Sequence, residues 1–89
     1  MRKSTHTSEY ASLRRRLADM RGSAGLSQRQ LATHLRVPHS WVAKVEAGER
    51  RIDLIEFAWF CAACGASPSE EAARLLEDVG ATLRKRGRR

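Results

Sequence analysis

The feature that most constrains this sequence is a pair of short helical patterns separated by only three residues, 36–38. The first begins at Ser27, where Ser-x-x-Gln forms a capping box. The second begins at Pro38, because proline disfavours helical geometry in the residue before it and fits the first turn of a new helix. We therefore expect two short helices over 27–35 and 38–47, joined by a tight turn.

The rest of the chain is also predicted to be helical. Over 8–24 apolar residues recur at spacings of three and four, and Gly25 follows as a terminator. Further helices are expected over 53–64 and 68–79, each opened by a capping Asp or Ser. The alternative for the second is that it continues through Gly80 to residue 83. No segment alternates as a strand does. The prediction is an all-α fold with five helices.

The second short helix has two different faces. Val42 and Val45 form its inner face, whereas the outer face carries short or polar side chains apart from Lys44. Such a face lets another helix-sized object approach closely. Two short helices with this character are typical of the arrangement that places a recognition helix in the major groove of DNA.

Composition restricts the class of protein. The chain has 89 residues and is 42% hydrophobic, which fits one soluble domain and excludes a disordered chain. No apolar run approaches the roughly 18–20 residues of a membrane span, and no secretory signal is visible. We expect a cytoplasmic protein encoded by a bacterium or phage. The formal net charge of +7 favours a polyanionic partner, either nucleic acid or an acidic membrane surface.

That charge is not spread evenly. Five positive charges fall in the last six residues, 84–89, so that residues 1–83 carry only +2. The predicted organisation is a flexible N-terminus over 1–7, one folded domain over 8–83 with the two-helix motif at 27–47, and a basic tail over 84–89. The tail is expected to be a frayed helix end or a disordered segment.

The motif has recognisable details. Ser-Gln-x-x-Leu-Ala opens its first helix at 27–32, Val37 precedes the turn, and Val-x-x-Val-Glu-x-Gly closes its second helix at 42–48. With these features the chain resembles the Cro/repressor-type (XRE, lambda-repressor-like) helix-turn-helix family over about residues 13–69. The resemblance implies a five-helix DNA-binding domain.

The resemblance also assigns roles by position. It implies base contacts from the second short helix, by His39, Ser40, Ala43 and Lys44. It implies contacts to the DNA backbone by Gln28, Arg29, Trp41, Arg50 and Arg51. An ion pair is implied between Arg21 and Glu46. For His39 the alternatives are a pH-sensitive switch and a plain surface residue, and Arg14, Arg15 and Arg16 are expected to form a solvated face rather than DNA contacts.

Three residues depart from the family pattern. Arg36 stands where the family has a left-handed Gly, so strain is expected there. Pro38 replaces a capping Ser or Thr. Trp41 is large for its position, and it is expected to stack on deoxyribose, to wedge beside the groove, or to rest on the start of the first short helix.

The segment 53–64 carries two apolar surfaces. Its main core face is expected to consist of Leu54, Phe57, Phe60, Cys61 and Cys64. A second stripe of Ile55, Trp59 and Ala62 is predicted to form a homodimer interface, because a chain this small could not easily cover it. The alternative is that the fifth helix covers this stripe within one chain.

Cys61 and Cys64 raise the alternatives of zinc binding and redox chemistry. Zinc needs four ligands, and only His34 and His39 lie nearby in sequence. Both cysteines lie near a helix C-terminus, whose dipole opposes thiolate formation. Core packing is therefore expected, with no metal and no cofactor. No residues have catalytic spacing, so an enzyme is not expected.

The function predicted from these features is a sequence-specific, dimeric transcriptional regulator that represses from a palindromic operator on double-stranded DNA. The alternatives are an antitoxin that represses its own operon, a restriction–modification controller protein, and an architectural binder that uses only charge. A toxin or antirepressor would be a protein partner. No small-molecule ligand is expected. Binding of the basic tail to a membrane surface is a weaker alternative, because the tail has too few apolar residues beside it.

Overall fold

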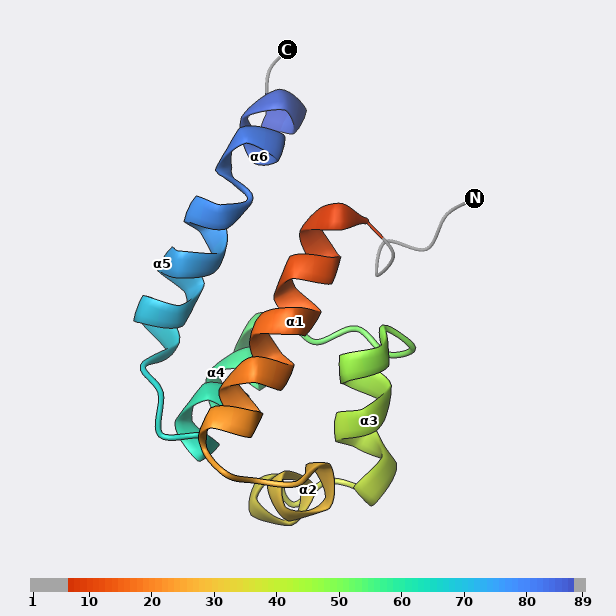
Figure 1. The fold of residues 1–89 in the computed structure, drawn as a ribbon. Coiled ribbons are helices and arrows are strands. Elements are labelled where there is room, and N and C mark those ends of the chain that lie inside the picture. The colour runs from red at the N-terminus through yellow and green to blue at the C-terminus, as the bar shows by residue number, and fades with distance from the viewer. Residues whose placement is uncertain (1–6, 88–89) are drawn as a thin grey trace.

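The computed structural model describes residues 7–87, and its regular structure there is entirely helical (Figure 1). The helices are α1 (Ser8–Ser23), α2 (Gln28–Leu35), α3 (His39–Ala47), α4 (Leu54–Ala63), α5 (Pro68–Asp78) and α6 (Gly80–Gly87). The flexible N-terminus predicted over 1–7 falls outside the described residues except at Thr7, which caps α1 by accepting from the Tyr10 amide. Residues 88 and 89 of the basic tail also fall outside them.

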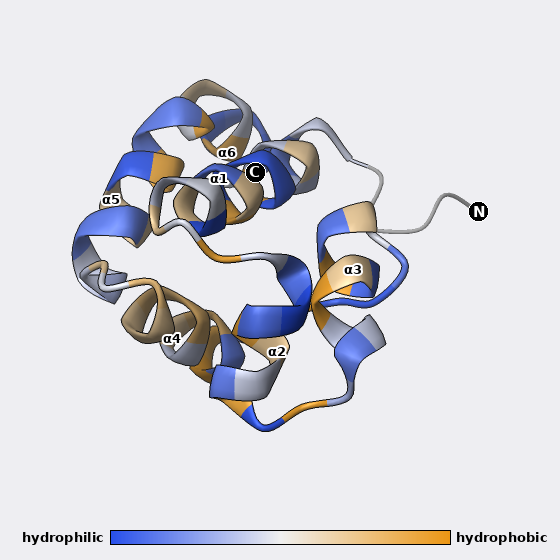
Figure 2. Ribbon diagram, turned by 60° about the horizontal axis from the view of Figure 1, so that its bottom comes forward, coloured by the Kyte–Doolittle hydropathy of each residue, from blue (hydrophilic) through white to orange (hydrophobic). Residues whose placement is uncertain are grey.

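The first four helices enclose one core, and α5 packs along α1 and α4 (Figure 1). The side chains that are fully buried come from all four of these helices: Leu17, Leu31, Val42, Val45, Phe60 and Cys61. Figure 2 shows α4 as hydrophobic along most of its length. Within residues 7–87, no helix combines the length and the apolar character that crossing a bilayer requires.

Local capping fixes where three helices begin, as the sequence predicts. In α2 the Gln30 amide donates to the Ser27 hydroxyl at 3.0 Å, and the Gln30 side chain accepts from the Ser27 amide at 2.8 Å. Asp53 and Glu56 make the same reciprocal pair at the start of α4. Ser67 caps α5. These bonds satisfy amides that have no partner inside the helix.

The turn between α2 and α3 adopts the strained conformation that the sequence indicates. Arg36 is the one non-glycine residue of positive φ among the described residues, at φ 58° and ψ 44°. The Val37 amide then donates to the Ala32 carbonyl at 3.1 Å, which closes the end of α2. Pro38 precedes α3 without a side-chain cap, also as expected.

The structure has six helices where five were predicted: α5 ends at Asp78, close to the expected end at 79, and the segment given as its alternative continuation belongs to a separate helix, α6. Val79 leaves helical geometry at φ −103° and ψ 11°, and α6 begins at Gly80, a residue of low helix propensity. The predicted domain boundary at residue 83 falls inside α6. The described part of the basic tail, 84–87, is thus the end of a helix, and Arg86 pairs with Glu9 of α1 at 2.9 Å.

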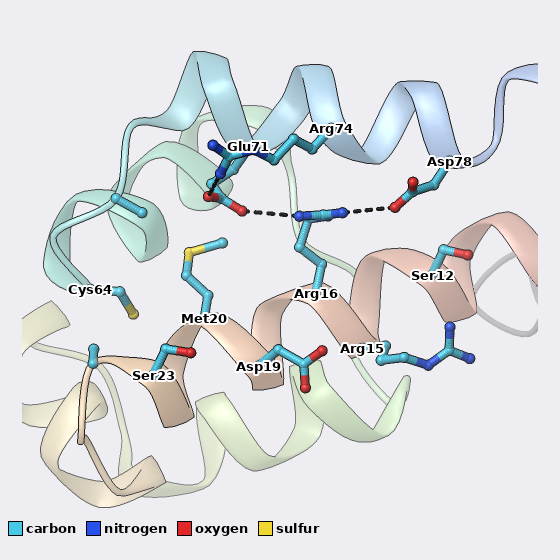
Figure 3. Close-up of a pocket in the computed structure, with 12 residues that line it drawn as sticks. Ser12, Arg15, Arg16, Asp19, Met20, Ser23, Cys64, Glu71, Arg74 and Asp78 are labelled. Carbon is cyan, nitrogen blue, oxygen red and sulfur yellow. Dashed lines mark hydrogen bonds and ion pairs between the residues drawn. The ribbon is translucent and has the colours of Figure 1, made fainter.

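The expectation of a solvated arginine face on α1 is wrong for two of its three members. Arg16 lies between α1 and α5, where it pairs with Asp78 at 2.7 Å and with Glu71 at 3.3 Å (Figure 3). Arg14 packs over Gly48, with Cδ 3.1 Å from the place a Cβ would occupy. Of the three, only Arg15 is exposed. The contacts of Arg14 and Arg16 join segments far apart in sequence, which a helical pattern does not reveal.

Replacing Arg36 by Gly should stabilise the protein. A left-handed L-residue is strained by about 1–2 kcal/mol, which exceeds the entropic cost of Gly, so the free energy of unfolding should rise by about 0.5–1 kcal/mol. Arg15→Gly, at an exposed helical position, is the control and should lose about 1 kcal/mol. Urea denaturation measures both, and an equal loss in the two variants would contradict the strain at Arg36.

Candidate nucleic-acid interface

Helix α3 presents a polar face away from the core. Val42 and Val45 are fully buried between α3 and its neighbours. On the opposite side His39, Ser40 and Lys44 are exposed, and Ala43 is half-buried. The 3.6-residue period places these four side chains on two successive turns of one helix. The residues expected to contact bases therefore lie together on one exposed surface.

A partly buried ion pair joins α3 to α1. The Arg21 Nε donates to Glu46 Oε2 at 2.7 Å and its Nη2 donates to Oε1 at 2.9 Å, so the expected pair forms and is bidentate. The Glu46 side chain is 9% exposed. Hydrogen bonding to Glu46 raises the pKa of Arg21 above its ordinary value, which keeps the guanidinium charged. The end of α1 is thereby joined to the end of α3.

Gln28 takes part in the same network, which the sequence motif alone does not indicate. Its Nε2 donates to Glu46 Oε1 at 2.9 Å, so α2 is tied to α3 as well. The Gln28 amide carries a second hydrogen, which leaves one donor for a phosphate. Its expected contact with the DNA backbone stays a prediction.

Trp41 is the most buried of the residues expected to contact the DNA backbone. Its side chain is 8% exposed and belongs to the core cluster. Burying an indole removes a large apolar area from water, which outweighs a contact at the domain surface. The Arg50 guanidinium covers the ring, 5.1 Å from its centroid. Its expected contact with the DNA backbone stays a prediction.

The loop between α3 and α4 is braced. Arg50 donates to both carboxylate oxygens of Glu56, at 2.9 and 3.1 Å, and this bond lowers the pKa of Glu56 below its ordinary value. The Ile52 amide donates to the Tyr10 hydroxyl at 2.9 Å, a link that sequence reasoning missed because the partners are far apart in sequence. Arg51 is exposed beside the Tyr10 ring. These bonds hold the loop to α4 and α1, and they leave the Arg51 side chain exposed.

Arg29 is also exposed, on the first turn of α2. Neither Arg29 nor Arg51 has an ion pair among residues 7–87, so both guanidinium groups are available to an anion. Arg50, by contrast, is already paired with Glu56. Among the arginines expected to contact the DNA backbone, Arg29 and Arg51 are therefore the two without an ion pair to another described residue.

The second apolar stripe of α4 lies at the surface. Ile55 is 59% exposed, Trp59 is 53% exposed, and Ala62 is exposed as well, so α5 does not cover them. Leu54 was expected in the core, but it is 76% exposed and extends this stripe. As the first residue of α4 it lies beyond the neighbouring helices. Beside Trp59 a hollow of about 350 Å³ opens between α2 and α4, next to His34.

The two cysteines pack as apolar residues. Cys61 is fully buried and burial raises its pKa to about 11, while burial also raises the pKa of Cys64. Raised thiol pKa values oppose thiolate chemistry at neutral pH. Among residues 7–87, no group of three or more His, Cys, Asp or Glu side chains is arranged to hold a metal ion.

Comparison with known proteins agrees with this architecture. Residues 12–75 match the family model of a helix-turn-helix domain. The structure of an XRE-family like protein from Pseudomonas syringae pv. tomato str. DC3000 is similar at a TM-score of 0.75 and 39% identity, covering 81% of this chain and 88% of that one. The clp gene regulator ClgR from Corynebacterium glutamicum shares the fold, at a TM-score of 0.70 and 21% identity over 90% of this chain and 85% of that chain. No curated protein matches the sequence.

The fold and the exposed face of α3 thus define a helix-turn-helix domain, a class of DNA-binding module. The match extends over most of the chain, and the structural relative is well above the identity at which only the fold is shared. The chain belongs to the XRE-type helix-turn-helix family.

Removing either partner of the Arg21–Glu46 pair should be costly, because the remaining charge is left without its partner. We expect Glu46→Leu and Arg21→Met each to lower the free energy of unfolding by about 2–4 kcal/mol, and the double variant to lose less than the sum. Arg74→Met, in an exposed pair with Glu71, is the control and should cost less than about 1 kcal/mol. Additive losses in denaturation experiments would refute coupling.

Proposed function

We propose that this protein is a sequence-specific, double-stranded DNA-binding transcriptional regulator, with α3 lying in the major groove. The observation that carries the proposal is the exposed face of His39, Ser40 and Lys44 on a helix whose opposite face is fully buried. A helix held in this way can present side chains to base edges without a free-energy cost for ordering the helix on binding.

Each side chain of that face suits a different contact. Lys44 donates only, which fits the N7 and O6 acceptors of guanine. Ser40 and His39 can hydrogen-bond a base or a phosphate. Ala43 is short enough to lie against a thymine methyl group. Gln28, Arg29 and Arg51 would contact the DNA backbone, where they add affinity rather than sequence preference.

The regulator is proposed to act as a homodimer through the exposed stripe of α4. One short helix contacts too few base pairs to select a site in a genome, so two copies are needed. The stripe of Leu54, Ile55, Trp59 and Ala62 is the apolar surface that a second copy would cover. A two-fold dimer of this kind binds a palindromic operator with half-sites about 34 Å apart, and repression would follow from occupancy of that operator.

Lys44→Ala tests sequence recognition against binding by charge alone. We expect a loss of about 1–3 kcal/mol on a selected operator and little change on random duplex DNA, because Lys44 contacts a base. Arg74→Ala is the matched control: it removes one exposed positive charge from α5 and should affect neither duplex. Fluorescence anisotropy measures the affinities of wild type and both variants for the two duplexes. Equal losses for Lys44→Ala on both duplexes would rule out base recognition by this residue.

Trp59→Glu tests the dimer. Placing a carboxylate in the centre of an apolar interface should leave the protein monomeric at tens of micromolar, where the wild type is expected to be dimeric. Thr33→Glu adds the same charge at an exposed position of α2 and should leave the dimer intact. Sedimentation velocity distinguishes these states. A monomeric wild type, or a variant that dimerises normally, would show that α4 is not the interface.

A further inference from the structure

The charges without partners on α5 and α6 are separated by sign. We call residues 68–87, which form these two helices, the C-terminal arm. Glu71 and Asp78 are paired with Arg16, Arg74 is paired with Glu71, and Arg86 is paired with Glu9. The remaining charged side chains are exposed and have no ion pair among residues 7–87; they are Glu70 and Glu77 on α5, and Arg84 and Lys85 on α6. The arm therefore has an acidic half and a basic half.

An apolar strip accompanies these charges. Leu76 of α5 is 54% exposed and Leu83 of α6 is 39% exposed, and the two are seven residues apart. Although the helix is interrupted at Val79, both leucines line one groove and therefore lie on the same side of the arm. Glu77 and Arg84 are also seven residues apart, so a charge of each sign accompanies the leucines.

The leucines border a groove between the arm and the start of α1. The groove has a volume of about 360 Å³, and Tyr10, Leu13, Leu75 and Val79 line it together with Leu76 and Leu83. Arg51 of the loop before α4 also lines it, and the exposed Leu54 follows three residues later. The groove thus reaches the loop that precedes α4.

We propose that the C-terminal arm is a docking surface for a second copy of this chain, packed antiparallel. In that orientation the acidic α5 of each copy lies beside the basic α6 of the other, and the leucines meet between them. A parallel arrangement would place like charges together, which is unfavourable. This inference rests on the proposed dimeric regulator and adds the arm to its α4 interface.

The charge pattern favours a second copy over an unrelated partner. A partner of uniform charge would be attracted by one half of the arm and repelled by the other. A two-fold axis across the middle of the arm satisfies both halves at once, because the same surface is used by both subunits. The arm is self-complementary in charge only when it meets itself in reverse.

Charge reversal in the full-length chain tests the proposal without DNA. One variant carries Glu70→Lys and Glu77→Lys, and the other carries Arg84→Glu and Lys85→Glu. We expect each alone to weaken self-association at low salt by about tenfold or more, because like charges then face each other. An equimolar mixture should recover a heterodimer, and a chain carrying all four changes should recover the homodimer. Sedimentation measures association, and circular dichroism confirms that each variant is folded.

Three outcomes would overturn the proposal. Wild-type association in both double variants would exclude the arm from the interface. A fourfold variant that stays as weak as the double variants would exclude the antiparallel pairing of α5 with α6. A monomeric wild type would exclude both the arm and the α4 dimer. The DNA-binding function fails separately, since the affinity of Lys44→Ala for an operator is measured with arm residues unchanged.

Discussion

The carboxylate of Glu46 is the point on which the arrangement of the helices depends. It lies on α3, it accepts from Arg21 at the end of α1, and it accepts from Gln28 at the start of α2. Arg21 also donates to the Leu26 carbonyl between α1 and α2, at 2.8 Å. A nearly buried carboxylate is tolerated only with such partners, so its position fixes the three helices relative to one another. The orientation of the exposed face of α3 follows from this.

The surface divides into regions of different chemistry around that fixed centre. The outer face of α3 carries polar or short side chains, which suit contacts with base edges. The stripe of α4 is apolar and uncovered, which suits another protein surface. The C-terminal arm carries opposite charges at its two ends. The net charge of +7 therefore does not indicate how much positive charge is available to a partner, because several arginines are paired between helices. Arg16 joins α1 to α5, Arg21 joins α1 to α3, and Arg50 joins the loop to α4.

Features that depend on neighbouring residues were predictable from the sequence, whereas tertiary contacts were not. The caps at Ser27 and Asp53 and the left-handed Arg36 are set by local backbone geometry. The helix break at Val79 comes directly before Gly80, a residue of low helix propensity, although the apolar pattern continues beyond it. The exposure of Leu54 and the burial of Trp41 depend on where other helices end. The pair of Arg21 and Glu46 came from a family resemblance, since no local pattern joins residues 25 positions apart.

Two copies of α3 are proposed to recognise one DNA sequence, each in its own half-site. Selection of bound sites from random DNA duplexes by the full-length protein tests this directly. We expect enrichment of one short motif that recurs as an inverted repeat, with centres one helical turn, about 34 Å, apart. Tight binding with no enriched sequence would contradict it, because the affinity would then come from charge alone.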